Sequence, residues 1–177
     1  MTKPAALLPG SFHPLHAGHR TLAAVAGRLI GETVDYELSR TNVDKQELDE
    51  AEIERRRKQF AEGERLWITR AATFVEKAKL FPGTTFVVGY DTAARLVDPC
   101  YYRNEPAERD RGLIALKETA CRIVVGGRID ATGQFRVWDE RAVVMELRTL
   151  FVPLVEADFR IDLSSTELRR LALNQES

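Results

Sequence analysis

The chain has 177 residues, of which 44% are hydrophobic, and its 26 Lys and Arg against 27 Asp and Glu give a formal net charge of −1. That length accommodates one domain with its own core, so we expect a single domain over residues 1–177. The even charge balance argues against a sequence-independent grip on nucleic acid, and no segment approaches the roughly 20 apolar residues of a membrane span. The two cysteines show neither metal-ligand nor disulfide-dense spacing, which fits a reducing compartment. We therefore expect a cytoplasmic protein without a nucleic-acid or membrane partner, and nothing in the sequence indicates whether it forms a homo-oligomer.

Apolar runs alternate with helical patterns along the first half of the chain. Residues 5–9 form a short apolar run closed by a glycine and a serine, which is typical of a buried parallel strand and its turn. Residues 18–30 place their apolar side chains on one helical stripe that ends near Gly31. The other elements expected here are a strand at 33–38, a loop at 39–45, a helix at 49–62, a strand at 66–68, a helix at 71–80 and a strand at 84–88.

The 49–62 segment is highly charged and has few apolar residues beyond Ile53 and Phe60. Its acidic residues precede its basic residues, which suits the helix dipole. Because runs of mixed charge usually face water, we interpret it as a solvated surface helix rather than a binding patch.

The second half of the chain continues the alternation. We expect helices at 92–97 and 113–119, a strand at 123–125, a turn at 132–134, a last strand at 150–155 and a last helix at 164–173. Residues 98–111 mix proline, tyrosine and arginine with acids, and we interpret them as a loop that moves over a site. Strands separated by helical segments indicate right-handed βαβ units. The predicted fold class is therefore α/β, a Rossmann-like, doubly wound parallel sheet with helices on both faces.

All three histidines, His13, His16 and His19, lie within seven positions at the junction of the first predicted strand and helix. Residues three apart on an opening helical turn share a face, so His16 and His19 can point together at an anion above the helix N-terminus. Gly18 lets a phosphate approach the backbone, and imidazoles can donate hydrogen bonds to its oxygens without a fixed charge. A capping or packing role is the alternative for any one histidine, and for His13 alone we favour it. The dinucleotide Gly-x-Gly-x-x-Gly and Walker-type motifs are both missing, so this string is the candidate phosphate site.

Residues 10–19, Gly-Ser-Phe-His-Pro-Leu-His-Ala-Gly-His, resemble the signature Gly-Ser-Phe-x-Pro-x-His-x-Gly-His of the nucleotidylyltransferase superfamily. That superfamily includes nicotinamide-mononucleotide adenylyltransferases, pantetheine-phosphate adenylyltransferase and cytidylyltransferases. The fourth residue of the signature is usually Asp or Asn, whereas this chain has His13. The resemblance implies that His16 and His19 are catalytic and contact the α- and β-phosphates. It also implies a nucleotide-binding role for Gly10, Ser11, Phe12 and Gly18.

A second stretch, Ser164-Ser165-Thr166 followed by Arg169, resembles the family's Ile-Ser-Ser-(Ser/Thr)-x-x-Arg. By spacing alone, Ser164 and Glu167 also form a capping box, which is the structural alternative. A capped helix start with hydroxyls and an arginine nevertheless suits a phosphate. The resemblance implies that Arg169 is catalytic and that this stretch holds the β- and γ-phosphates.

Weaker resemblances complete the candidate site. Gly89 and Asp91 follow a β-branched run as in the family's Gly-x-Asp, whose acid holds the nucleoside, with a helix N-cap as the equal alternative. Arg128 follows a predicted strand end that carries an arginine in the family, and a plain surface arginine is equally compatible with the sequence. Lys45 and Trp67 are candidates for acceptor binding, Trp67 by stacking on a planar base.

The resemblance implies attack by an acceptor's phosphate oxygen on the α-phosphorus of ATP, with release of pyrophosphate. Mg²⁺ would be held mostly by ATP and water rather than by a protein metal site. ATP is favoured over CTP because the Arg-Thr-Glu-Gly-type string of the cytidylyltransferase branch is missing, and nicotinamide mononucleotide is the leading small phosphorylated acceptor. The alternatives are another acceptor or CTP, a non-catalytic nucleotide-binding or regulatory protein, and an aminoacyl-tRNA synthetase fragment. Chain length and charge argue against the last of these.

Overall fold

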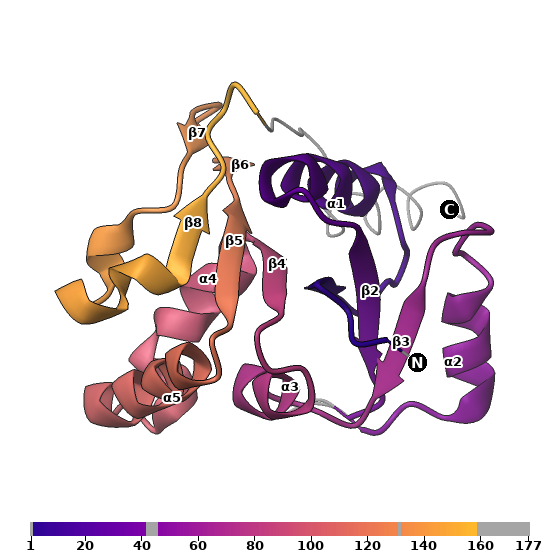
Figure 1. Ribbon diagram of the computed structural model, residues 1–177, viewed down its shortest axis with the longest axis horizontal. Coiled ribbons are helices and arrows are strands. Elements are labelled where there is room, and N and C mark those ends of the chain that lie inside the picture. The colour runs from indigo at the N-terminus through magenta and orange to yellow at the C-terminus, as the bar shows by residue number, and fades with distance from the viewer. Residues whose placement is uncertain (1, 42–45, 131, 159–177) are drawn as a thin grey trace.

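The computed structural model describes residues 2–41, 46–130 and 132–158. Six strands form one parallel sheet in the order β3-β2-β1-β4-β5-β8, and Figure 1 shows it running from β8 at one end to β3 at the other. This order is that of a doubly wound Rossmann-like sheet and confirms the predicted fold class. The strands are β1 (Ala6–Pro9), β2 (Val34–Ser39), β3 (Leu66–Thr69), β4 (Thr85–Gly89), β5 (Arg122–Gly126) and β8 (Phe151–Pro153). Two further strands, β6 (Arg128–Ile129) and β7 (Phe135–Arg136), form an antiparallel hairpin around the predicted turn.

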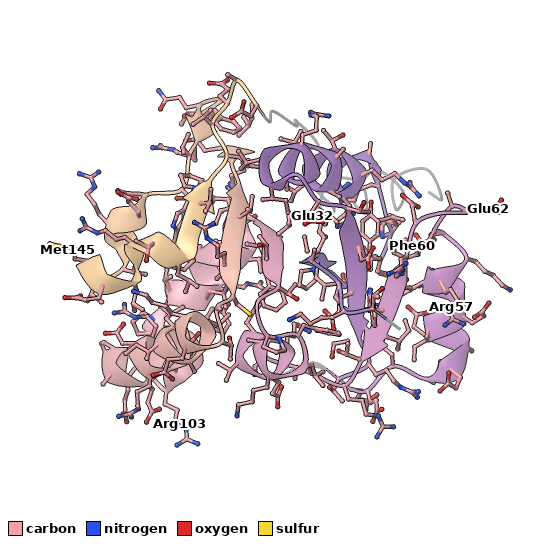
Figure 2. The ribbon with its side chains drawn as sticks, viewed as in Figure 1. Glu32, Arg57, Phe60, Glu62, Arg103 and Met145 are labelled. Carbon is pink, nitrogen blue, oxygen red and sulfur yellow. The ribbon has the colours of Figure 1, made fainter. Side chains whose placement is uncertain are left out.

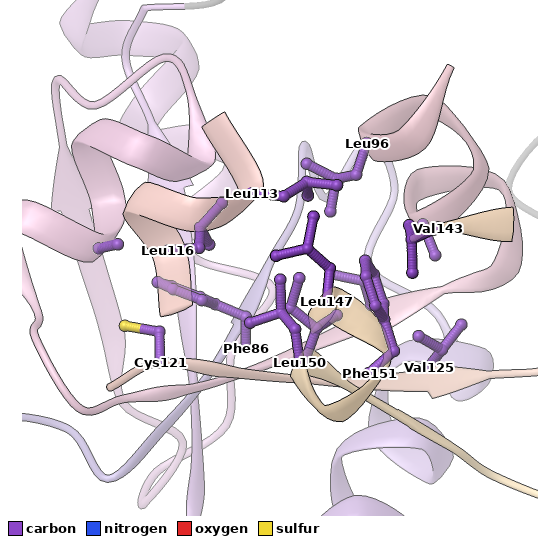
Figure 3. Close-up of a cluster of buried hydrophobic side chains, with 14 of the residues drawn as sticks. Phe86, Leu96, Leu113, Leu116, Cys121, Val125, Val143, Leu147, Leu150 and Phe151 are labelled. Atoms are coloured by element: carbon purple, nitrogen blue, oxygen red, sulfur yellow. The ribbon is translucent and has the colours of Figure 1, made fainter. Parts of the chain in front are cut away.

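Helices cover both faces of the sheet. They are α1 (Ala17–Ile30), α2 (Glu50–Arg57), α3 (Phe74–Leu80), α4 (Tyr90–Val97) and α5 (Pro106–Glu118), with 3₁₀ turns η1 (Pro99–Tyr102), η2 (Glu140–Ala142) and η3 (Met145–Leu150). Side chains alternate along a strand, so Ala6 and Leu8 of β1 pack with α1, while Leu7 packs with the opposite layer. That opposite layer is built by α3, α4, α5 and η3. Its buried cluster includes Phe86, Leu113, Leu116, Leu147, Leu150 and Phe151 (Figure 3).

A buried ion pair lies between β2 and α3. The Lys77 ammonium is 3.0 Å from the Glu37 carboxylate, and the two side chains are only 6% and 1% exposed. Thr69 of β3 donates a hydrogen bond to Glu37, and Lys77 donates a second bond to the carbonyl of Ala71. Burial of these charges is compatible with folding because each is paired and hydrogen-bonded.

The structure corrects several predicted boundaries. The loop predicted at 98–111 is wrong, because this stretch forms η1 and the first half of α5, which contacts α3. Pro106 lies in the first turn of α5, where proline favours a helix start instead of breaking the helix. The helix expected over 49–62 ends at Arg57, and the one expected from residue 71 begins at Phe74 behind the cap Thr73. The predicted last helix at 164–173 falls outside the described residues.

Within the three described ranges, no helix is both long enough and apolar enough to cross a membrane.

Candidate nucleotide-phosphate site

Three of the predicted stretches meet at one edge of the sheet. Residues 10–19 follow β1, Gly89 and Asp91 lie at the end of β4, and Arg128 follows β5. The strands are parallel, so their carboxyl ends lie at the same edge, and the strand order reverses between the neighbours β1 and β4. A ligand crevice of a doubly wound sheet lies beyond the strand ends at such a reversal. The structure thus places the N-terminal signature, the Gly-x-Asp stretch and Arg128 at the same edge of the sheet.

His16 and His19 cap the helix that they begin. The Nδ1 atom of His16 accepts a hydrogen bond from the Gly18 amide (3.1 Å), and the Nδ1 atom of His19 accepts one from the His16 amide (3.3 Å). Together these contacts form a capping box made by two imidazoles, with their ring centroids 3.9 Å apart. The predicted common face of the two histidines and the alternative capping role are therefore both present.

The same geometry sets the protonation of both rings. A neutral imidazole whose Nδ1 accepts a hydrogen bond carries its proton on Nε2, so the hydrogen bonds assign the Nε2–H tautomer to both neutral rings. Burial lowers the pKa of His16, and burial together with the nearby His16 and Arg20 lowers the pKa of His19 to about 4. The lowered pKa values favour the neutral form of both rings at neutral pH, and a neutral imidazole meets an anion as a hydrogen-bond donor rather than as a fixed cation.

Phe12 anchors the loop in front of these histidines. Its ring is fully buried and makes edge contacts with His19 (5.3 Å between centroids), Tyr36 (5.7 Å) and Phe60 (5.2 Å). A Cβ at Gly10 would lie 2.6 Å from this ring, so glycine is required there for close packing. Phe12 has a φ of +47°, a conformation that side chains rarely adopt and that the surrounding contacts must hold.

Residues from α2 and the turn after it hold the same loop, which sequence reasoning did not identify. Arg56 donates to the carbonyl of Ser11 (2.7 Å), and Arg55 donates to Nδ1 of His13 (2.6 Å). Hydrogen bonds from Arg55 and Arg56 lower the pKa of Glu52 to about 2, so an ionised carboxylate fixes both guanidinium groups.

The face of α2 that points toward the sheet is therefore not solvated, in contrast to the surface helix predicted for residues 49–62. The Arg56 side chain is only 11% exposed, whereas that of Arg57 is 59% exposed. Figure 2 shows Arg57 projecting away from the sheet and Phe60 lying on the side of α2 that faces the sheet. The signal in the sequence was the pair of successive arginines, which the spacing alone could not connect to residues more than forty positions away.

Asp91 and Arg128 form an ion pair at the strand ends, with 2.5 Å between Nη1 and Oδ1. Gly89 is the N-cap of α4, so Asp91 lies in the first turn of that helix and is not its cap. Both side chains are substantially exposed, at 71% for Asp91 and 45% for Arg128. Asp91 can accept hydrogen bonds from ribose hydroxyls, and it lies beside a cation, Arg128, that can bind a phosphate.

The remaining predicted residues lie elsewhere or outside the described ranges. The Trp67 indole donates to Asp35 (2.8 Å), and its ring packs edge-on against Phe81. These contacts give Trp67 a packing role between the sheet and α3, and its surroundings offer no support for acceptor stacking. Lys45, Ser164, Ser165, Thr166 and Arg169 fall outside the described residues.

Comparison with known families agrees with this arrangement. The chain matches the family described as "Cytidylyltransferase-like" over residues 7–171, which is nearly its whole length. The chain belongs to this family. Membership in the cytidylyltransferase-like family confirms the resemblance to the nucleotidylyltransferase superfamily and supports a nucleotidyltransferase activity in general. A search among curated proteins finds no match.

Proposed function

We propose that the protein transfers the adenylyl group of ATP to a small phosphorylated acceptor, with nicotinamide mononucleotide as the leading acceptor, and releases pyrophosphate. The observation that carries the proposal is the His16–His19 capping box at a helix start that follows β1, beside the strand-order reversal, in which the Nδ1 atom of each ring accepts a backbone hydrogen bond and so holds the ring in place. Such a site suits phosphate oxygens, because the donors are fixed before the ligand arrives.

No side chain needs to act as a nucleophile in this reaction, since an acceptor phosphate oxygen attacks the α-phosphorus directly. Catalysis then consists of positioning and of stabilising the charge that spreads over the phosphate oxygens. His16 and His19 donate to the α- and β-phosphates, and Asp91 accepts from the ribose. Ser164, Ser165, Thr166 and Arg169 are proposed to hold the β- and γ-phosphates.

In this proposal the Mg²⁺ is carried by the nucleotide rather than held by protein side chains. Among residues 2–41, 46–130 and 132–158, no group of three or more His, Cys, Asp or Glu side chains could hold a metal. The nearby acids Asp91 and Glu52 are each paired with arginine. When bound with ATP, the ion would neutralise triphosphate charge, its ligands being phosphate oxygens and water.

The test is pyrophosphate release from ATP or CTP against a panel of phosphorylated acceptors led by nicotinamide mononucleotide. We expect release with ATP, and we expect His19→Ala to lower turnover by the equivalent of about 2–4 kcal/mol, as for loss of one oxyanion donor. His13→Ala removes an imidazole from the same loop and should cost much less. Release with CTP or with another acceptor would redirect the substrate assignment.

A non-catalytic role is the second candidate. It is favoured if ATP binds, as measured by calorimetry, while no acceptor in the panel yields pyrophosphate. Unchanged turnover in His19→Ala would refute the role assigned to that histidine.

A further inference from the structure

The loop between β1 and α1 takes its hydrogen-bond partners from a distant part of the chain. Residues 11–15 contain backbone groups that no helix or strand of their own satisfies, and buried groups of this kind require partners. Arg56 supplies one at the Ser11 carbonyl, and Gln59, in the turn after α2, supplies two more.

Gln59 bridges the loop with both ends of its amide. Its Nε2 donates to the carbonyl of Phe12 (2.9 Å), and its Oε1 accepts from the amide of Leu15 (2.8 Å). The contacted groups flank residues 13 and 14, so the amide fixes the separation between the two ends of this turn. Leu15 immediately precedes His16, the helix cap.

The backbone of Gln59 is tied to the other side of the site. Arg20, next to His19, donates to the Gln59 carbonyl (3.0 Å) and pairs with Glu64 (2.8 Å). The following residue, Phe60, packs against the buried Phe12 ring. Gln59 is thus anchored to α1 through its main chain while its side chain holds the loop that leads into α1.

We propose that Gln59 is a positioning residue for the nucleotide-phosphate loop, whose amide bridge sets where His16 and His19 present their donors. The expected effect on catalysis rests on the proposed function. The expected effect on the loop rests on the hydrogen bonds alone. A misplacement of about 1 Å in a catalytic group can lower the rate on the order of 100-fold. We therefore expect loss of the bridge to lower kcat.

The bridge requires a primary amide of this length. It needs one donor and one acceptor attached to the same carbon, which the amide of the glutamine side chain provides. An ionised glutamate keeps the acceptor for Leu15 but sets a carboxylate oxygen against the carbonyl of Phe12. Leucine has a similar volume and offers neither group, and asparagine is one methylene short.

The experiment compares Gln59→Glu and Gln59→Leu with the matched control Gln46→Leu, in which the replaced glutamine is exposed. We expect both Gln59 variants to lower kcat by about 10- to 100-fold with the acceptor KM changed less than about threefold, and Gln46→Leu to match the wild type. Gln59→Asn should not restore kcat. A core variant with equal loss of stability, such as Ile123→Val or Leu113→Ala, separates positioning from general destabilisation and should retain near-normal kcat.

Amide hydrogen exchange at Leu15 tests the bridge without catalysis. We expect exchange of this amide to accelerate at least about tenfold in Gln59→Leu and to stay slow in Gln46→Leu. Unchanged Leu15 exchange, wild-type kcat in both Gln59 variants, or an equal kcat loss in the stability-matched core variant would overturn the inference. If wild-type protein releases no pyrophosphate with any acceptor, the proposed function fails while the exchange result still decides the bridge.

Discussion

Acidification should destabilise the protein through His19. Its ring is half-buried, accepts a hydrogen bond at Nδ1 and has a pKa of about 4, against 6.5 for an ordinary histidine. The unfolded chain therefore binds a proton more readily than the folded chain between these two values, so stability is fully present above pH 6.5 and is lost as the pH falls toward 4. Between pH 7.5 and pH 5 this one group should remove about 2 kcal/mol from the free energy of unfolding.

Urea denaturation at a series of pH values measures this loss, with His19→Gln as the test variant and His13→Gln as the exposed-histidine control. We expect the wild type and His13→Gln to lose stability in parallel below pH 6.5, while His19→Gln loses about 2 kcal/mol less over the same interval. Equal pH slopes in the wild type and His19→Gln would refute the argument. They would show that the His19 ring titrates normally in the folded protein.

Three further results are expected from single sites. Arg128→Ala should change the free energy of unfolding by less than about 1 kcal/mol, because its pair with an aspartate is exposed, yet raise the KM for ATP several-fold in the pyrophosphate assay. Gly10→Ala should cost about 1–3 kcal/mol in urea denaturation, because the added Cβ meets the buried Phe12 ring. Lys77→Met should cost about 3–5 kcal/mol by leaving the Glu37 carboxylate buried and unpaired.

Each of these has an internal check. A Cβ at Gly89 meets nothing within 4 Å, so Gly89→Ala is the control for Gly10→Ala, and equal losses would contradict the packing argument. The double change of Glu37 to Leu with Lys77 to Met should recover most of the stability lost in Lys77→Met. An ATP KM unaffected by Arg128→Ala would remove that arginine from the proposed site.

The sequence was most informative where local pattern and function coincide. The run from Ala6 to Ile30 carries its strand and its amphipathic helix close together in the sequence, and the structure confirms both of them. The parallel sheet followed from the same alternation of elements. Asp91 and Arg128 were each identified by motif, but only the fold brings them into contact, because they follow different strands.

The miss in residues 49–62 has a physical cause, which is contact over a long sequence distance. The charged composition of residues 49–62 predicts a solvated helix. No neighbouring residue in the sequence indicates that Arg56 and Gln59 hold a loop more than forty residues earlier. Residues 98–111 predict a loop because they contain two prolines and few apolar residues, while the two buried leucines that mark α5, Leu113 and Leu116, lie beyond this stretch.

The bridge between residues 12–15 and Gln59 also orders the assembly of the molecule. The loop that carries the family signature follows β1, yet its backbone partners arrive only after β2 and α2 have been added. Contacts over such separations require closure of the intervening chain before they stabilise anything. The signature loop therefore cannot gain these hydrogen-bond partners before residues 56–59 are part of the chain, and a fragment ending before residue 50 would contain the whole signature without them.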